Sequence, residues 1–223
     1  MRDVATGCPR RLALAHRGHR RDFQADARFA VSNAIEEHAR LAQLEEQRPD
    51  PTVFRPDATV TPEERAVYEH ATRWYLFLYG DRIACSFDLG DSEWGRDRPD
   101  LGIRLTSRRP LVFESAQGPE LRILRLNGAP ARTDLLDDLE VRVDILRLAG
   151  EVATESLQVY VSDLVRGEHA AATISIPAVA RDLELWLRDA IEEVRAAVDA
   201  DGPRIGADCA WCPYVAGCPA HAP

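Results

Sequence analysis

Lysine is absent from this sequence, and all 28 basic residues of the 223-residue chain are arginine. Any mechanism that requires a lysine amine is therefore excluded. Long apolar runs are also missing: no stretch reaches the roughly 18 apolar residues that a membrane span needs. Residues 1–20 contain arginines but not the apolar centre of a secretory signal. We therefore expect a cytoplasmic protein without a membrane partner.

Basic residues are fewer than acidic residues in this chain. The chain has 37 acidic residues, a formal net charge of -9 and a sequence pI of about 5.2. A protein that coats nucleic acid would be basic, so any contact with DNA is expected to be local. One basic patch lies near the N-terminus and comprises Arg10, Arg11, Arg17, Arg20 and Arg21, with His16 and His19 among them. Arg17, Arg20 and Arg21 are the candidate nucleic-acid-binding residues, and a solvated helix face is the alternative interpretation.

Four of the five cysteines are candidate metal ligands. Cys209, Cys212 and Cys218 have the spacing C-x2-C-x5-C, and Cys8 is the candidate fourth sulfur. Three of these four cysteines precede a proline, as at the end of the bacterial ferredoxin ligand run. Because four thiolates ligate an iron–sulfur cluster, a [4Fe–4S] cluster is favoured. Zinc, with Cys8 or His221 as the further ligand, and the absence of any metal both stay open.

A shared cluster would also have a mechanical effect, because it would join the two ends of the chain. A purely structural role for the cluster is therefore a serious alternative. Trp211 and Tyr214, inside the cysteine-rich tail, either stack on bases or pack around the cluster. The fifth cysteine, Cys85, lies in an apolar run and is interpreted as a small buried core residue.

Hydrophobic spacing and turn residues predict the elements of the fold. Helices are expected at 9–20, 25–47, 61–80, 134–149 and 177–202, an antiparallel β region at 82–126 with turns near 90–99, 107–110 and 116–119, and further strands at 156–165 and 171–176. The helix at 61–80 has the clearest start, with Thr61 as N-cap, Pro62 in the first turn and Glu64 completing a capping box. This order predicts an α/β (mixed α+β) fold with one central sheet flanked by helices.

The cysteine motifs give the sequence a resemblance to a known family. An early Cys-Pro-Arg-Arg before a helix, a strand-rich middle, a long helix and a terminal C-x2-C-P-x4-C-P resemble the iron–sulfur branch of the PD-(D/E)xK nuclease superfamily. That branch includes the CRISPR-associated RecB-like exonucleases and the AddB nuclease domain. The resemblance implies a single nuclease-like domain over 1–223, with a helical part at 1–80, a sheet core at 81–176 and a helix plus cysteine tail at 177–223. It also implies a metal-dependent attack on phosphodiesters, in which carboxylates hold Mg²⁺ or Mn²⁺ and a lysine assists.

The residues that the family uses for hydrolysis are missing here. The family strands read roughly G-x-x-D and then hydrophobic-D-x-K-T-G. Leu105 replaces the first Asp, and D-x-K is replaced by Arg125 and Asn127 or, in the neighbouring register, by Leu124 and Leu126. The family's helix histidine is matched by Asn33 or Ala34, with His38 a turn later, and His38 is better interpreted as a core or boundary residue.

Three functions follow as expectations. The first is a catalytically inactive nuclease fold that keeps its cluster and acts as a binding or interaction module in DNA processing, repair or defence, with DNA and a DNA-processing protein as partners. The second is an active nuclease with a rearranged Mg²⁺ or Mn²⁺ centre built from Asp100, Glu114 and Glu120, with Arg122 in a loose E-x-R pair. The third is an iron–sulfur or zinc protein with a redox or structural role, although no flavin or nicotinamide fingerprint is present.

Overall fold

The computed structural model describes residues 27–57, 61–87, 95–106, 111–126, 134–149 and 155–200. The chain divides into two compact units. One unit, Ala25–Ala180, contains all the described strands, and the other combines Met1–Gln24 with Arg181–Pro223. In the second unit the described part is the continuation of helix α6 (Ile176–Ala200). The assignment of the whole chain to one domain stays a prediction.

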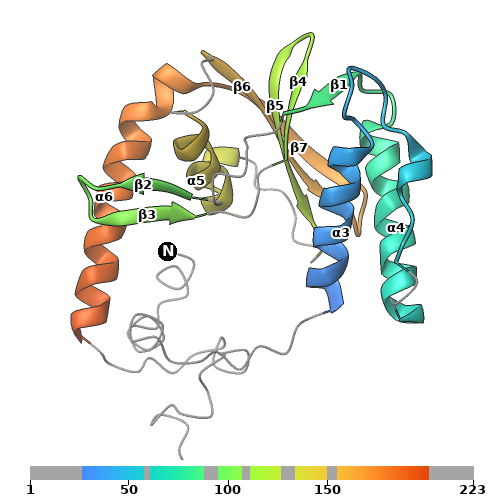
Figure 1. The fold of residues 1–223 in the computed structure, drawn as a ribbon. Helices are drawn as coiled ribbons and strands as arrows, with labels where there is room; N and C mark the ends of the chain where they lie inside the picture. The colour runs from blue at the N-terminus through green and yellow to red at the C-terminus, as the bar shows by residue number, and fades with distance from the viewer. Residues whose placement is uncertain are drawn as a thin grey trace, which may run out of the picture. The chain divides into compact units, whose positions relative to one another are not determined.

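A five-stranded mixed sheet forms the centre of the Ala25–Ala180 unit, with the strand order β1-β4-β5-β6-β7 (Figure 1). The strands are β1 (Ala84–Ser86), β4 (Leu111–Ser115), β5 (Gly118–Arg125), β6 (Ser156–Asp163) and β7 (Glu168–Ser175). Neighbours are antiparallel except β5 and β6, which are parallel because a helical connection separates them in the chain. The predicted mixed α+β fold with one central sheet is confirmed at this level.

A separate two-stranded hairpin precedes β4 and consists of β2 (Gly95–Arg98) and β3 (Ile103–Thr106). The prediction of a turn over 90–99 is therefore wrong for residues 95–98. The β2 sequence Gly-Arg-Asp-Arg has no apolar alternation from which a strand could be predicted. Pairing with β3 places Asp97 opposite Arg104, and their side chains form an ion pair of 3.7 Å. Cross-strand pairing of this kind stabilises a strand that its own residues do not favour.

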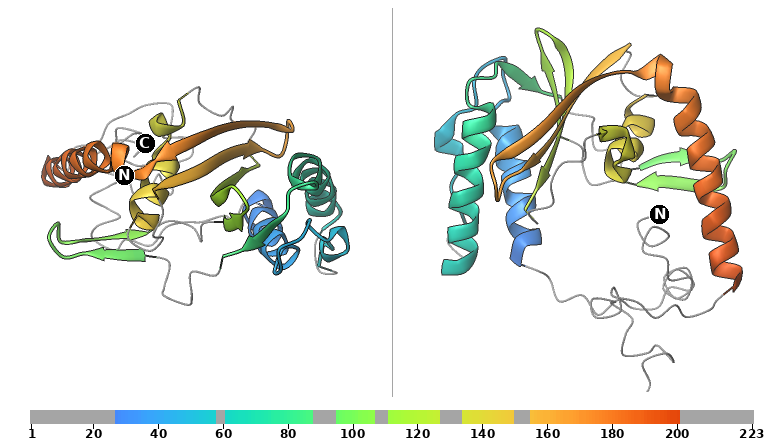
Figure 2. Two further views of the ribbon diagram at one scale, coloured as in Figure 1. Left: turned by 90° about the horizontal axis from the view of Figure 1, so that it is seen from above. Right: turned by 180° about the vertical axis from the view of Figure 1, so that it is seen from behind.

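Helices α3 (Ala27–Leu41) and α4 (Pro62–Tyr79) lie side by side on one face of the sheet, and α5 (Leu139–Leu148) lies on the other (Figures 1 and 2). Helix α4 starts as predicted: the Thr61 hydroxyl accepts from the Glu64 backbone N–H at 3.2 Å, and the Glu64 carboxylate accepts from the Thr61 N–H at 2.7 Å. A short 3₁₀ turn, η2 (Leu135–Asp137), leads into α5, so the predicted helix at 134–149 is largely confirmed.

Helix α3 ends at Leu41, whereas the prediction extended it to residue 47. The Gln43 side chain is fully buried, and its Nε2 donates to the carbonyls of Gln47 at 3.1 Å and Arg82 at 3.0 Å. The backbones of Gln47 and Ala84 also pair, so this segment runs beside β1. The helix prediction is wrong for residues 42–47 because these tertiary contacts override helical propensity.

Strand β6 ends two residues earlier than predicted. The Asp163 Oδ1 accepts from the backbone N–H groups of Val165 at 2.8 Å and Arg166 at 3.2 Å, which turns the chain toward β7. Gly167 completes this turn with a φ of 70°. A Cβ atom there would lie 2.0 Å from the Trp74 ring, so only glycine fits between the turn and helix α4.

Helix α6 begins with Pro177 in its first turn, as predicted. Among its described side chains, Leu183, Leu187 and Ile191 are buried and repeat every four residues along the expected apolar face, and Ile176 is buried at the start of the helix. None of the described helices is both long and apolar enough to cross a membrane.

The two edges of the sheet differ in how they are protected. Strand β1 has three residues, and the chain at Gln43–Gln47 covers its outer side through backbone hydrogen bonds. Strand β7 has eight residues that all pair with β6, and none of the residues described pairs with its outer side. The sheet therefore has one covered edge and one open edge within the described part of the chain.

Candidate functional site

A buried polar cluster lies on the sheet face that α3 and α4 cover. Its centre is Arg122 of β5, which is 1% exposed. The Arg122 guanidinium donates to Glu120 Oε2 through Nε at 3.2 Å and through Nη2 at 2.9 Å. Its Nη1 donates to Gln43 Oε1 at 2.7 Å and to the Tyr75 hydroxyl at 3.0 Å. One side chain thus joins β5, helix α4 and the segment after α3.

The second carboxylate oxygen of Glu120 is also paired. Glu120 is 2% exposed, and its Oε1 accepts from Arg82 Nη1 at 3.1 Å. The Arg82 guanidinium in turn lies over the Tyr160 ring, 4.2 Å from its centroid, in cation–π geometry. Two guanidinium groups therefore bind one buried carboxylate.

Buried hydroxyl groups complete the cluster. The Tyr79 hydroxyl, on α4, forms a hydrogen bond with the Ser162 hydroxyl on β6. Burial raises the pKa of Tyr79 well above its usual range, and burial likewise raises the pKa of Tyr75. Both phenols therefore stay protonated at neutral pH and act as neutral hydrogen-bond partners.

The arrangement is suited to holding elements together and unsuited to hydrolysis as it stands. A metal-binding carboxylate needs free oxygens and access from solvent. Glu120 has neither, because both its oxygens are bound by arginines and its side chain is 2% exposed. Buried charges are tolerated in proteins when they are paired and hydrogen-bonded in this way.

The strand positions expected to hold the hydrolytic residues are mostly apolar. Leu105 is 2% exposed, Leu124 6% and Leu126 7%. The alternative register gives Arg125, whose Nη2 forms an ion pair of 2.5 Å with Asp138. Neither register places a free carboxylate at these positions. Asn127 lies outside the described residues.

The helix positions offer no clear metal ligand either. On α3, Asn33 is exposed and Ala34 is half-buried. His38 is half-buried, forms a hydrogen bond with the Tyr68 hydroxyl and packs edge-on against Phe54. The interpretation of His38 as a boundary residue is confirmed.

The three carboxylates of the rearranged-centre hypothesis are not brought together. Asp100 binds Arg98 in a two-bond ion pair, with distances of 2.9 and 3.0 Å. Glu114 lies on the opposite sheet face from Glu120, because the register pairs Phe113 with Glu120 and side chains alternate along a strand. Over the whole described part of the chain, no three His, Cys, Asp or Glu side chains form a group that could hold a metal ion.

The partners of Arg122 were not predicted from the sequence. Gln43 and Tyr75 are 79 and 47 residues away in the chain. A usable signal exists in β5, where Glu120 and Arg122 occupy alternate positions among the apolar residues Leu121, Ile123 and Leu124. Charged residues at buried strand positions need partners, so this pattern predicts a buried polar cluster.

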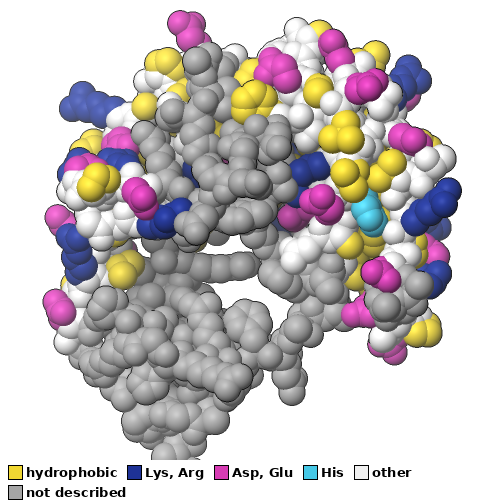
Figure 3. Space-filling model, in the orientation of Figure 1, with side chains coloured by type: hydrophobic (Ala, Val, Ile, Leu, Met, Phe, Trp, Pro, Cys, Tyr) yellow, Lys and Arg dark blue, Asp and Glu magenta, His cyan; other side chains and the backbone are white. Residues whose placement is uncertain are grey.

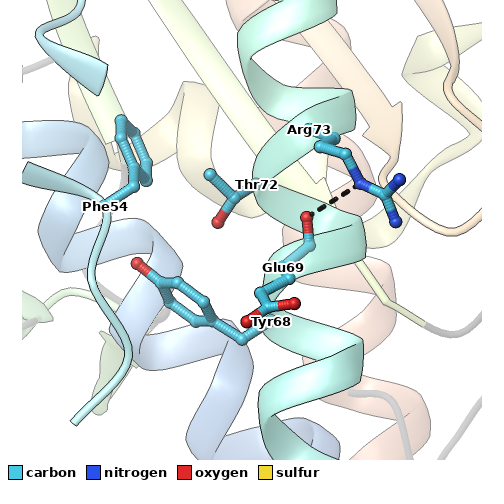
Figure 4. Close-up of a pocket in the computed structure, with 5 residues that line it drawn as sticks. All are labelled: Phe54, Tyr68, Glu69, Thr72 and Arg73. Atoms are coloured by element: carbon cyan, nitrogen blue, oxygen red, sulfur yellow. Dashed lines mark hydrogen bonds between the residues drawn. The ribbon is translucent and has the colours of Figure 1, made fainter. Parts of the chain in front are cut away.

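A pocket of about 420 Å³ lies beside α4, and none of the charged residues of the cluster lines it. In Figure 4, Tyr68, Glu69, Thr72 and Arg73 line it from α4, and Phe54 faces them from the segment after η1 (Pro51–Val53). Its two charged residues, Glu69 and Arg73, have opposite signs. The pocket therefore offers no net positive charge to a nucleic-acid phosphate.

The pH dependence of stability provides a test of the His38 environment. Burial lowers the pKa of His38, and the Glu37 carboxylate partly opposes this. Because the unfolded chain then binds the proton more tightly, stability is expected to fall as the pH drops below about 6.5. Replacing His38 with Gln should reduce this loss, measured as the change in melting temperature between about pH 7.5 and pH 5.5.

The matched control for this test is His169→Gln, because His169 is exposed on β7. The control should keep the wild-type pH dependence. An unchanged pH dependence in the His38 variant would contradict the assignment of the effect to this ring.

The remaining predicted site residues, Cys8, Cys209, Cys212, Cys218, Arg17, Arg20 and Arg21, lie outside the described residues. Cys85, which is described, is half-buried instead of fully buried, and its thiol donates to the Leu44 carbonyl at 2.9 Å. On the face drawn in Figure 3, acidic and basic side chains are interspersed over the described surface. The described part of that face therefore offers no uniformly basic area for nucleic acid.

Comparison of the chain with protein-family models and with curated proteins finds no match in either.

Proposed function

We propose that this chain is a catalytically inactive protein of PD-(D/E)xK nuclease-like fold, which carries a [4Fe–4S] cluster and acts as a binding or interaction module in DNA processing, repair or defence. A mixed sheet flanked by helices is compatible with this fold. The observation that carries the proposal is the replacement of the candidate hydrolytic positions. Leu105 and Leu124 are buried apolar side chains, and Glu120 is held by two arginines.

The cluster is proposed from the chemistry of its donor set. Cys8, Cys209, Cys212 and Cys218 supply four thiolates, the number that a cubane cluster requires. When bound, the cluster supplies a covalent link between distant parts of the chain, and in this proposal that link is structural. Zinc bound by the same cysteines would give a similar link without iron chemistry.

Binding to DNA is proposed for the N-terminal arginines. Arg17, Arg20 and Arg21 lie close to Cys8 in the sequence, and guanidinium groups bind phosphates well. A DNA-processing protein is the second proposed partner. The overall negative charge of the chain limits DNA binding to such a local patch.

A DNA assay on anaerobically purified protein tests the proposal. With Mg²⁺ or Mn²⁺ present, we expect no cleavage of single- or double-stranded DNA, because no free carboxylate group stands at the hydrolytic positions. We expect binding that weakens steeply with salt. The triple variant Arg17→Ala, Arg20→Ala, Arg21→Ala should reduce the slope of log affinity against log salt by about 2–3 on duplex DNA.

The outcomes separate the hypotheses. Metal-dependent cleavage that is lost on replacing Asp100, Glu114 and Glu120 with Ala would replace the proposal with an active nuclease. If the triple variant binds DNA with the same affinity and salt dependence as the wild type, Arg17, Arg20 and Arg21 do not bind DNA. A matched control is the triple variant of exposed arginines elsewhere, Arg65, Arg73 and Arg166, which should leave the salt slope unchanged.

A further inference from the structure

The outer edge of β7 lacks most of the features that usually prevent strands from pairing between molecules. Such features are short length, bulges, proline, or charged side chains along the strand. Strand β7 has eight residues in unbroken register with β6. Its sequence, Glu-His-Ala-Ala-Ala-Thr-Ile-Ser, has no proline and only one acidic residue, Glu168, at its first position.

Most side chains of β7 are also exposed. Six of its eight residues are exposed, and only Ile174 is buried. The described helices leave most side chains of this strand exposed, although η2 lies close to it, and an approaching strand could reach its backbone. The opposite edge differs, because β1 is short and is hydrogen-bonded by the segment at Gln43–Gln47. The sheet thus closes one edge and leaves the other with unpaired backbone donors and acceptors within the described residues.

We propose that β7 is a self-association surface, on which the β7 strand of a second copy of this chain pairs antiparallel to form one continuous sheet. Two identical strands that pair in this way are related by a two-fold axis. Along β7, residues alternate between those whose N–H and C=O groups point outward and those whose groups point toward β6. In an antiparallel pair, two residues directly opposite each other both point these groups toward the partner strand or both point them away. The two-fold axis therefore passes next to one residue of each strand, and that residue lies directly opposite the same residue of the second copy.

The residues at the centre of β7 fit this symmetry. With the axis at the middle of the strand, the residue that meets its own copy is Ala171 or Ala172, and both are exposed. A charged or bulky residue there would meet an identical charge or bulk, whereas two methyl groups are compatible. In these registers Glu168 lies opposite Ile174 or beyond the paired region, so no two acidic side chains oppose one another.

This symmetry argument is what favours a second copy over an unrelated peptide. The two edges supply matching backbone groups, small side chains and no charge conflict. The pairing of one strand from each copy buries little surface, so the association is expected to be weak and concentration-dependent.

The test is sedimentation equilibrium of the full chain over about 1–500 µM, a range suited to a weak interface. We expect a reversible monomer–dimer equilibrium for the wild type. Ala171→Lys and Ala172→Lys each place like charges near the axis, and the one at the axis should weaken dimerisation about five- to ten-fold. Mixing that variant with the Glu variant of the same position should restore dimer formation, because opposite charges then meet.

The matched control is Ala66→Lys, since Ala66 is exposed and belongs to α4 instead of β7. It should dimerise like the wild type, and circular dichroism should show that all variants are folded. A wild type that stays monomeric over the whole range would overturn the proposal. So would a dimer that neither β7 variant weakens, because that dimer would use another surface.

Discussion

Replacing Arg122 with methionine is expected to lower the free energy of unfolding by about 3–5 kcal/mol, because breaking a buried ion pair is strongly destabilising. Glu120 then keeps the partly exposed Arg82 as its guanidinium partner. The variant keeps an apolar stem of similar length but removes the guanidinium. Glu120 Oε2 then loses its partner, and the acceptors on Gln43 and Tyr75 lose their donor. Denaturant unfolding, monitored by fluorescence and extrapolated to water, measures the change.

The double variant Glu120→Leu, Arg122→Met separates the effect of the two charges on stability from the effect of the volume that the two side chains fill. Replacing both buried charges with apolar groups of similar size is often neutral or stabilising, so the double variant should be more stable than Arg122→Met alone. Arg82, whose side chain is 30% exposed, can then turn to solvent. A double variant no more stable than the single one would show that the Glu120 carboxylate left without Arg122 does not cause the loss of stability in Arg122→Met.

A surface ion pair provides the matched control. Arg104 and Asp97 are 3.7 Å apart, with side chains 41% and 73% exposed. Arg104→Met should change the free energy of unfolding by about 1 kcal/mol or less, because solvent screens exposed pairs. A comparable loss in the Arg104 and Arg122 variants would contradict the special role of the buried cluster.

Replacing Cys212 with serine is expected to produce the other large effect. If the four cysteines share a cluster, the variant should lose iron, sulfide and the broad absorption near about 400 nm that is typical of cysteine-ligated [4Fe–4S] clusters. The link between Cys8 and the C-terminal cysteines closes a loop of about 200 residues. By analogy with disulfide loop closure, losing it should reduce stability by on the order of 5 kcal/mol.

Cys85→Ala is the control, because Cys85 lies at strand β1 and is not one of the proposed ligands. It should retain the metal and most of the stability. One zinc and no iron in the wild type would reject the iron–sulfur proposal and keep the structural link. Metal-free wild-type protein, or a Cys212 variant as stable as the wild type, would reject the link itself.

The elements that the sequence predicted well are those with local signals. The start of α4 follows from Thr61, Pro62 and Glu64, whose interactions span only three residues. The hydrophobic face of α6 follows from the spacing of its leucines. Such signals depend on neighbours in the chain, and pattern reasoning can therefore identify them.

The elements that were wrongly predicted depend on distant partners. The end of α3 is set by the pairing of Gln47 with Ala84 and by the buried Gln43 side chain. Strand β2 exists because β3 pairs with it, although its own residues do not favour a strand. In the same way, the partners of Arg122 come from elements that only the folded chain brings together. The arginines and cysteines of the proposed sites remain predictions from the sequence.

The two ion pairs that Glu120 forms with Arg82 and Arg122 also affect how this chain can change during evolution. A carboxylate that binds a catalytic metal must be reachable and unpaired, whereas Glu120 is 2% exposed and bonded to two guanidinium groups. A substitution that frees it, at Arg82 or Arg122, also weakens the attachment of the helices to the sheet. Under the proposed function, regaining hydrolysis at this position would pass through less stable intermediates. Under the proposed function, the buried cluster would therefore make the loss of activity difficult to reverse one substitution at a time.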